Sequence, residues 1–139
     1  MAIIKTKFPQ INRNILETLQ INIGYKCNQA CSHCHVDASP SRTEMMREEI
    51  IKIIPKVIKA NNIKMLDITG GAPDLHPKFK QLVTEVRSLN VEVMDRCNLT
   101  ILTEPGYEYL ANFLATNKVQ ITASLPCYLE NNVDKQRGK

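Results

Sequence analysis

The chain has 139 residues, of which 43% are hydrophobic and 23% are charged. This length suits one domain with a hydrophobic core, and the composition excludes a disordered or collagen-like protein. No apolar run reaches the roughly 20 residues that a membrane-spanning helix needs, and the start MAIIKTKFPQ lacks the apolar stretch of a secretory signal. The net charge of +4 is mild and tryptophan is absent, so nucleic acid is not an expected partner. We therefore expect a cytoplasmic protein that binds neither membranes nor nucleic acid.

Short β-rich runs alternate with amphipathic segments along the chain. Alternation of apolar and polar residues predicts strands over 19–23, 65–69, 91–95 and 119–124. A polar loop follows the first strand and runs to about residue 42. A helix with apolar residues from Met46 to Ile58 comes next, with Ser41 and Glu44 as its capping box and Pro55 as a kink. A second helix begins near residue 77 and a third near 103–105, the latter with Tyr107, Leu110 and Leu114 facing inward.

The order of strands and helices sets the fold class. Strands that alternate with helices imply right-handed crossovers and a parallel sheet, so we expect an α/β fold, either open or curling toward a barrel. The chain ends soon after the fourth predicted strand, in a polar run for which we predict no helix. Residues 1–139 are thus expected to form a single domain that is incomplete at its C-terminal end.

Five cysteines stand out in this otherwise ordinary composition. Their odd number, in a chain without an export signal, favours metal, cluster or thiol chemistry over a disulfide framework. Each of them comes after a predicted strand: Cys27, Cys31, Cys34, Cys97 and Cys127. Because functional groups of parallel α/β folds gather beyond the carboxyl ends of the strands, we expect all five thiols at that edge.

The segment CNQACSHC carries the strongest chemical signal. Thiolates at Cys27, Cys31 and Cys34 can bind three irons of a 4Fe–4S cluster and leave the fourth iron without a protein ligand. Zinc is an alternative, because three cysteines with His33 or His35 make a closed tetrahedral site. A redox dithiol is less favoured, since it leaves the third cysteine without a role.

These residues resemble the radical S-adenosylmethionine superfamily. CNQACSHC has the family's CxxxCxxC form after the first strand, and DITGGAPDLHP is similar to its GGEP-like second motif. The longer strings INIGYKCNQACSHCHVDASP and SLPCYLENNVDKQRGK are most similar to the Cys-rich, arsenosugar-biosynthesis branch. The resemblance implies a partial parallel (β/α) barrel with about four of the six strand–helix units.

The resemblance also implies which residues bind the cofactors. The three clustered cysteines would hold a 4Fe–4S cluster, and the amino and carboxylate groups of S-adenosylmethionine would chelate its fourth iron. His33 stands where the family usually has an aromatic residue next to the adenine. The turn of Gly70, Gly71, Ala72 and Pro73 would offer backbone carbonyls to the methionine ammonium, with Ala72 where many members have Glu.

Weaker candidates follow the later strands. Asp95, with Arg96 and Asn98, leaves the third strand where the family often binds the nucleoside or the methionine carboxylate. Ser124 ends the fourth strand and could contact the ribose. For each of them a loop cap or a surface ion pair is the competing interpretation.

The implied reaction is reductive cleavage of S-adenosylmethionine to methionine and a 5′-deoxyadenosyl radical. In the arsenosugar branch the deoxyadenosyl group would be added to a methylated trivalent arsenical. The expected partners are this small-molecule substrate, an electron donor such as flavodoxin or ferredoxin, and a separately encoded C-terminal half.

Cys97 and Cys127 could serve that substrate, because soft trivalent arsenic prefers thiolate ligands. The competing interpretation is a pair of half-buried free thiols without a chemical role. Two further hypotheses stay open for the whole chain: a non-catalytic zinc- or metalloid-binding Cys/His module, and a fragment that folds poorly.

Overall fold

The computed structural model describes residues 9–12, 14–125 and 127–137. Its centre is a parallel sheet with the strand order β1-β2-β3-β4. The strands are β1 (Thr18–Asn22), β2 (Met65–Thr69), β3 (Glu92–Cys97) and β4 (Gln120–Ala123). Strand order follows chain order, as expected when each crossover carries the chain to the next position in the sheet. The structure thus confirms the predicted α/β class and all four strands.

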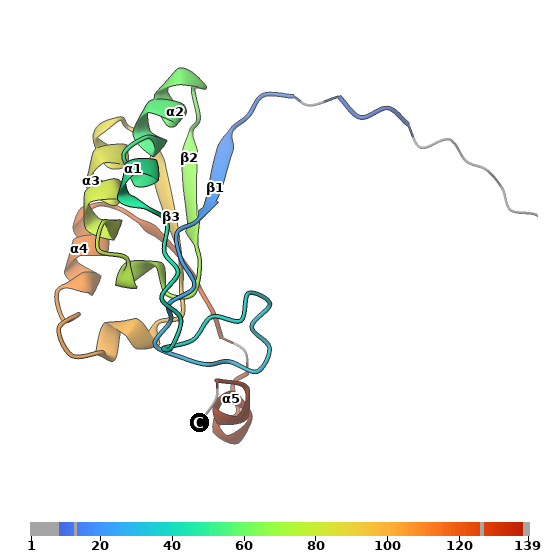
Figure 1. The fold of residues 1–139 in the computed structure, drawn as a ribbon, viewed down its shortest axis with the longest axis vertical. Helices are drawn as coiled ribbons and strands as arrows, with labels where there is room; N and C mark the ends of the chain where they lie inside the picture. The colour runs from blue at the N-terminus through green and yellow to red at the C-terminus, as the bar shows by residue number, and fades with distance from the viewer. Residues whose placement is uncertain (1–8, 13, 126, 138–139) are drawn as a thin grey trace, which may run out of the picture.

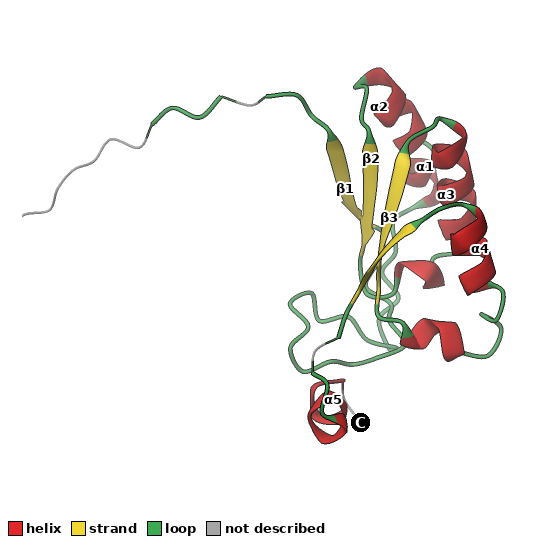
Figure 2. Ribbon diagram, turned by 180° about the vertical axis from the view of Figure 1, so that it is seen from behind, coloured by secondary structure: helices red, strands yellow, loops and turns green. Residues whose placement is uncertain are grey.

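Helices lie on one side of this sheet. They are α1 (Glu48–Ile51), α2 (Ile54–Ala60), α3 (Phe79–Ser88) and α4 (Leu110–Thr116). Figures 1 and 2 show all four against the same face, whereas the described residues place no helix on the opposite face. Two 3-10 turns, η1 (Pro73–Leu75) and η2 (Thr100–Thr103), follow β2 and β3. This one-sided layer is consistent with part of a (β/α) barrel whose interior is the open face.

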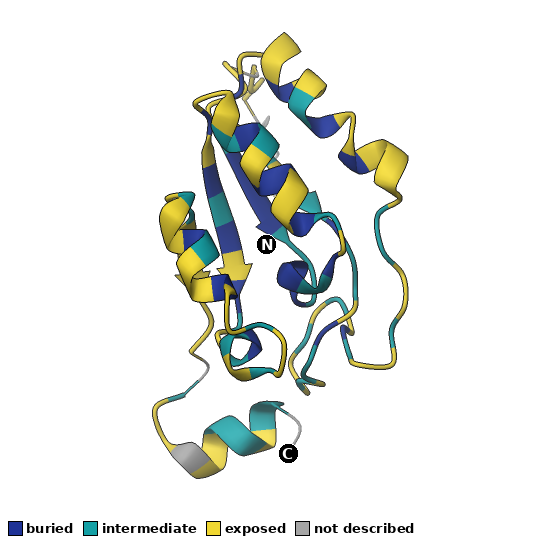
Figure 3. Ribbon diagram, turned by 90° about the vertical axis from the view of Figure 1, so that its left-hand side faces the viewer, coloured by how far each residue is buried: buried dark blue, intermediate teal, exposed yellow. Residues whose placement is uncertain are grey.

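The hydrophobic core is formed by residues of the sheet and of these helices. Figure 3 shows buried positions recurring along both the strands and the helices. The core contains Leu66 and Ile68 of β2, Val93 of β3 and the apolar face of α3, namely Phe79, Leu82, Val83 and Val86. These side chains are at most 1% exposed. Among the described residues no helix combines the length and the apolar character needed to cross a membrane.

The helix predicted after the polar loop begins later than expected and is divided in two. Glu44 does not cap it, because the Glu44 carboxylate accepts hydrogen bonds from Arg42 and from the Thr43 backbone N–H. The helical chain starts instead at Glu48 and is interrupted at residues 52–53. Pro55 lies in the first turn of α2, where its missing N–H costs no helical hydrogen bond.

Two further predictions about helices are wrong. The segment 103–105 does not start a helix, because a turn at Gly106 (φ +87°) intervenes and α4 begins at Leu110. The polar C-terminal run, for which we predicted no helix, forms α5 (Glu130–Arg137). Its composition is too polar to produce an apolar stripe, and the contacts that hold it are described below.

Candidate functional site

A long loop between β1 and α1 carries the three clustered cysteines. Its two arms pair through isolated bridges between Gly24 and Met45 and between Lys26 and Ser39. The Cys27 backbone N–H donates to the Ser39 carbonyl at 3.1 Å. These contacts bring the start and the end of the loop together, so that the cysteines lie on a constrained tip.

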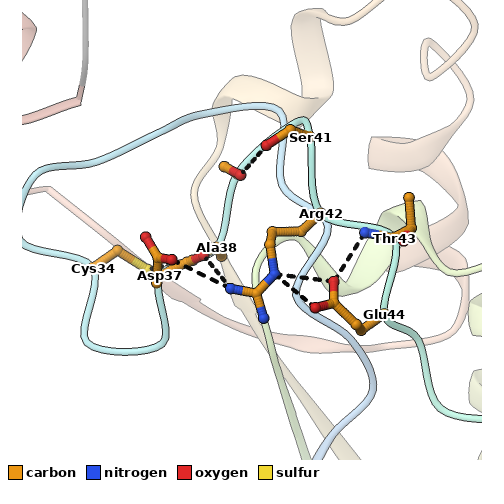
Figure 4. Close-up of polar contacts among 8 residues, drawn as sticks. Cys34, Asp37, Ala38, Ser41, Arg42, Thr43 and Glu44 are labelled. Atoms are coloured by element: carbon orange, nitrogen blue, oxygen red, sulfur yellow. Dashed lines mark hydrogen bonds and ion pairs between the residues drawn. The ribbon is translucent and has the colours of Figure 1, made fainter.

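Arg42 stabilises the returning arm of this loop (Figure 4). Its guanidinium donates to the Glu44 carboxylate at 3.0 Å and to the Asp37 carbonyl at 3.1 Å, and it lies 5.0 Å from the centre of the Tyr25 ring. The hydrogen bond from Arg42 lowers the pKa of Glu44 to about 2, although this carboxylate is exposed. Arg42 therefore connects residues on both sides of the turn that follows Cys34.

Amide groups donate to the sulfur atoms of the clustered cysteines. Cys27 Sγ accepts from the Gln29 N–H at 3.4 Å and from the Asn98 side-chain amide at 3.5 Å. Cys34 Sγ accepts from the Ala38 N–H at 3.3 Å. Hydrogen bonds of this kind stabilise thiolates and are one of the means by which proteins tune iron–sulfur clusters.

The three thiols line one cavity of about 270 Å³ at the carboxyl edge of the sheet. Polar residues from the ends of all later strands line it too. The remaining lining residues are Gln29, His33, His35, Ala38, Thr69, Gly70, Gly71, Arg96, Asn98, Thr122, Ser124 and Arg137. Burial and the neighbouring Cys27 raise the pKa of the Cys31 thiol, whereas the Arg137 guanidinium lowers it.

The glycine turn after β2 is joined to the cysteine loop by backbone hydrogen bonds. Gly71 N–H donates to the Gly24 carbonyl and Ala72 N–H to the Lys26 carbonyl, both at 2.9 Å. A Cβ atom on Gly70 would lie 2.6 Å from the Gly24 oxygen. The sequence indicated that these glycines allow close approach to a ligand. The structure shows that they also allow close approach to the segment leading to Cys27.

A charged pair lies on the helix-free face next to the cavity. Arg96 donates to both oxygens of Asp67, with the shortest distance 2.8 Å, and Gln20 donates to Asp67 at 2.7 Å. The hydrogen bond from Arg96 lowers the pKa of Asp67, which is therefore ionised at neutral pH. This bidentate geometry holds the Arg96 guanidinium at the cavity wall.

Arg137 of α5 connects three segments around the cavity. Its guanidinium donates to the Gln29 side-chain oxygen at 2.5 Å, to the Asn98 carbonyl at 3.2 Å and to the Ser124 carbonyl at 2.6 Å. The Ser32 N–H donates to the Gln136 carbonyl at 2.9 Å. Figures 1 and 2 show α5 beyond the carboxyl ends of the strands, beside the cysteine loop.

The cavity collects most of the candidate residues but not all of them. Those that line it are Cys27, Cys31, Cys34, His33, Gly70, Gly71, Arg96, Asn98 and Ser124. Ala72 and Pro73 do not line it, because the chain turns inward after Gly71 and buries both of them. Cys127 is half-buried and also lies outside the lining.

Asp95 and Cys97 require a clear correction. The sequence places Asp95 at the end of the third strand and Cys97 in the loop beyond it, with both side chains at the cofactor-binding edge, but β3 extends to Cys97. Side chains alternate along a strand, so Asp95 and Cys97 point into the helix-covered core with Val93, whereas Arg96 points to the cavity. Both are 0% exposed. Asp95 therefore does not reach a ligand in the cavity, and Cys97 cannot form a substrate site there together with Cys127.

Sequence reasoning missed several lining residues. Thr69 and Thr122 are strand residues whose direction only the register reveals, and Gln29 lies inside the cysteine motif. Arg137 lies 103 residues after Cys34 in a segment without helical periodicity, and no local signal linked it to the cysteines.

A parallel α/β sheet with three thiols at the carboxyl edge defines a class of metal- or cluster-binding proteins, and comparison with known proteins names the family. The family model described as the Radical SAM superfamily matches residues 21–135. The chain therefore belongs to the radical SAM superfamily, whose members use a 4Fe–4S cluster and S-adenosylmethionine.

Relatives and solved structures agree with this assignment. The chain is 30% identical over 94 residues to a probable GTP 3′,8-cyclase of Saccharolobus islandicus, a match that covers 67% of this chain and 30% of that protein. It is 25% identical over 77 residues to a probable GTP 3′,8-cyclase of Sulfurisphaera tokodaii, which covers 55% of this chain and 25% of that protein. The chain thus spans about a quarter to a third of the length of these curated relatives.

Among solved structures, the fold is similar to that of SuiB from Streptococcus suis. The TM-score is 0.68 at 18% identity, and the match covers 89% of this chain and 27% of SuiB. A second SuiB structure, bound to S-adenosylmethionine, matches with a TM-score of 0.66 at 20% identity. This likeness confirms the partial-barrel fold.

The residues of the cavity fit the family's cofactors. Three thiols with amide donors to two of their sulfurs suit a cluster, and the described residues bring no fourth cysteine to the cavity. Arg96 and Arg137 suit an anionic group such as a carboxylate. His33 and His35 are exposed on the same loop, so the donor set by itself also allows zinc.

Proposed function

We propose that this chain is the cluster- and cofactor-binding part of a radical SAM enzyme, with residues 1–139 forming one core domain. The observation that carries the proposal is the convergence of Cys27, Cys31 and Cys34 on one cavity that faces the Gly70–Gly71 turn at the carboxyl edge of a parallel sheet. When bound, the cluster supplies the electron that cleaves S-adenosylmethionine. The protein's part is to hold, orient and shield these groups.

The proposal gives the surrounding residues distinct tasks. The three thiolates would hold iron, while the amides of Gln29, Ala38 and Asn98 keep two of the sulfurs charged and oriented. The Gly70–Gly71 backbone would contact the methionine ammonium, because neither residue has a side chain that blocks its carbonyl. His33 would lie along the adenine and Ser124 near the ribose.

A finer proposal concerns the substrate. The strings around the cysteine motif and after β4 resemble the arsenosugar-biosynthesis branch, which supports addition of the deoxyadenosyl group to a methylated trivalent arsenical. We propose further that a small redox protein such as flavodoxin or ferredoxin provides the electron, and that a separately encoded polypeptide provides further barrel units. Such units would extend the sheet past β4, which is its edge strand and whose four residues are all exposed.

The test begins with anaerobic reconstitution of the chain with iron and sulfide. We expect iron and labile sulfide in nearly equal amounts, with loss of both in Cys31→Ser. Cys127→Ser is the matched control, because Cys127 lies outside the cavity lining. A chain that holds zinc but no iron or sulfide after this treatment would favour the zinc-binding module instead.

The reaction is tested on the reconstituted protein. After reduction with dithionite in the presence of S-adenosylmethionine, we expect 5′-deoxyadenosine in the wild type and not in Cys31→Ser. Adding a methylated trivalent arsenical should shift the product to an arsenical that carries the 5′-deoxyadenosyl group. If 5′-deoxyadenosine forms but no arsenic–carbon product is found, the family assignment of the activity holds and the proposed substrate is wrong.

A further inference from the structure

A second group of metal-ligating side chains lies outside the cavity. Asp74 of η1, with Asp95 and Cys97 of β3, places one ligand atom each within 4.8 Å of the other two. The three residues belong to the helix-covered side of the sheet, whereas the clustered cysteines line the cavity at its edge. The proposed function uses none of them.

The carboxylates of this group lack partners. Within the described residues, all four oxygens of Asp74 and Asp95 are buried without a hydrogen bond from any other residue, and neither side chain takes part in an ion pair. The two carboxyl groups can bond only to each other, through a shared proton. Asp95 is 0% and Asp74 5% exposed. Burying an ionised carboxylate without a partner costs several kcal/mol, so a proton or a cation must compensate the charge.

A shared proton explains only part of this arrangement. It would join the two carboxyl groups and neutralise one of them, but it leaves the second carboxylate buried beside Cys97 Sγ. Alternation along β3 turns this sulfur to the same side, and it accepts from the Leu99 N–H at 3.3 Å. The nearby His76 does not neutralise the pair, because its Nε2 contacts the Met46 carbonyl and its Nδ1 accepts from the Lys78 N–H. Two oxygen donors and one sulfur donor within 4.8 Å of one another instead form a candidate set of metal ligands.

We propose that Asp74, Asp95 and Cys97 form a buried binding site for a divalent cation, separate from the clustered cysteines, with Zn²⁺ as the best match. Zn²⁺ accepts carboxylate and thiolate ligands together, whereas Mg²⁺ and Ca²⁺ prefer oxygen alone. Binding requires the thiol and the carboxyl groups to release their protons, and burial raises the pKa of all three.

The position of the site suggests a structural task. Asp74 follows the Gly70–Gly71 turn, and Cys97 directly precedes Asn98, whose amide donates to Cys27 Sγ at 3.5 Å. An ion bound to both sides would fix the turn relative to the end of β3. It would thereby stabilise the parts of the cavity wall formed by Gly70–Gly71 and by Asn98, from the helix-covered side of the sheet. This inference does not depend on the proposed function.

The experiment uses the full chain with Cys27, Cys31 and Cys34 all changed to Ser, so that the cavity thiols cannot bind the metal. After treatment with a chelator and titration with Zn²⁺, we expect about one ion per chain and a higher midpoint of thermal unfolding. With Co²⁺ as the probe, a thiolate-to-cobalt charge-transfer band should appear. Adding Cys97→Ser should remove that band, whereas adding Cys127→Ser should leave it.

Asp95→Asn in the same background should weaken Zn²⁺ binding at least about tenfold, the scale that loss of even an outer-shell partner produces. The proposal is overturned if the triple-Ser variant binds no Zn²⁺, or if Asp95→Asn and Cys97→Ser together leave its affinity unchanged. Should Asp95→Asn fail to fold, the Zn²⁺-dependent midpoint of the triple-Ser variant decides: an increase supports the site and no change overturns it. The triple-Ser variant lacks the cluster thiols, so the result of its Zn²⁺ titration does not depend on whether the proposed enzymatic activity exists.

Discussion

Replacing Gly71 by alanine tests whether the glycine turn and the cysteine loop form one unit. The new Cβ would lie 2.9 Å from the Lys26 carbonyl carbon and 3.0 Å from the Ala38 Cβ. Carbon atoms in contact keep about 3.5–4.0 Å apart, so the two segments must separate by roughly 0.6 Å or more. That shift would stretch two backbone hydrogen bonds, now both 2.9 Å long, beyond the usual range. At about 0.5–1.5 kcal/mol for each bond, we expect Gly71→Ala to lower the free energy of unfolding by about 1–3 kcal/mol.

Chemical denaturation followed by circular dichroism measures this loss, and anaerobic reconstitution measures its effect on the site. We expect less iron per chain in Gly71→Ala, because the Lys26 segment that must move leads directly to Cys27. Gly106→Ala is the control, since it strains a backbone with φ +87° but its Cβ meets no atom within 4 Å. It should leave the iron content unchanged. If Gly71→Ala equals the wild type in both stability and iron content, the turn does not support the loop as described.

Three further predictions address other parts of the structure. Arg137→Ala should speed hydrogen exchange at the Ser32 amide, because it removes side-chain contacts that hold α5 to the cysteine loop. The control Lys135→Ala should leave that exchange rate unchanged. Equal exchange rates in the two variants would contradict the role of Arg137. Asp67→Asn should cost about 1–2 kcal/mol at pH 7, a value reduced for the half-exposed Arg96. Folding lowers the pKa of Asp67, so the wild type keeps this stabilisation above the ordinary aspartate pKa of 3.8 and loses it as the pH falls below that value. A stability difference from Asp67→Asn that stays constant during this fall would refute the assignment. Phe79→Ala should cost about 3–5 kcal/mol in urea denaturation, since Phe79 is 1% exposed, and a cost below about 1 kcal/mol would contradict its place in the core.

Local patterns were sufficient for much of the fold and for the centre of the site. Alternation predicted β2 at its observed bounds and the other strands to within a few residues. The spacing of Cys27, Cys31 and Cys34 placed them together without knowledge of the fold, because a loop of eight residues cannot separate them widely. The Gly70–Gly71 turn was also predicted from a local pattern, because it comes directly after a strand that the sequence marks clearly.

Longer-range features were not accessible in this way. The third strand ends two residues later than its pattern indicated, and this places Cys97 within β3. The side chains of Asp95 and Cys97 both point into the helix-covered core, which the pattern did not indicate. Arg96, between them, takes the position at the cavity wall that we had given equally to Asp95. The helix α5 has no apolar stripe, and its contacts with the cysteine loop come from side chains about a hundred residues apart in the chain.

Residue periodicity and the spacing of three cysteines thus established an α/β domain with a metal- or cluster-binding loop, since both signals arise between near neighbours in the chain. Which side of each strand meets the helices, and which residues from distant segments share the cavity, depends on register and on packing. Neighbouring residues of a strand point to opposite faces of the sheet. Arg96 therefore lies at the cavity, whereas Asp95, one residue earlier, lies in the buried group with Asp74. That separation, with the position of Arg137, was decided by the tertiary structure alone.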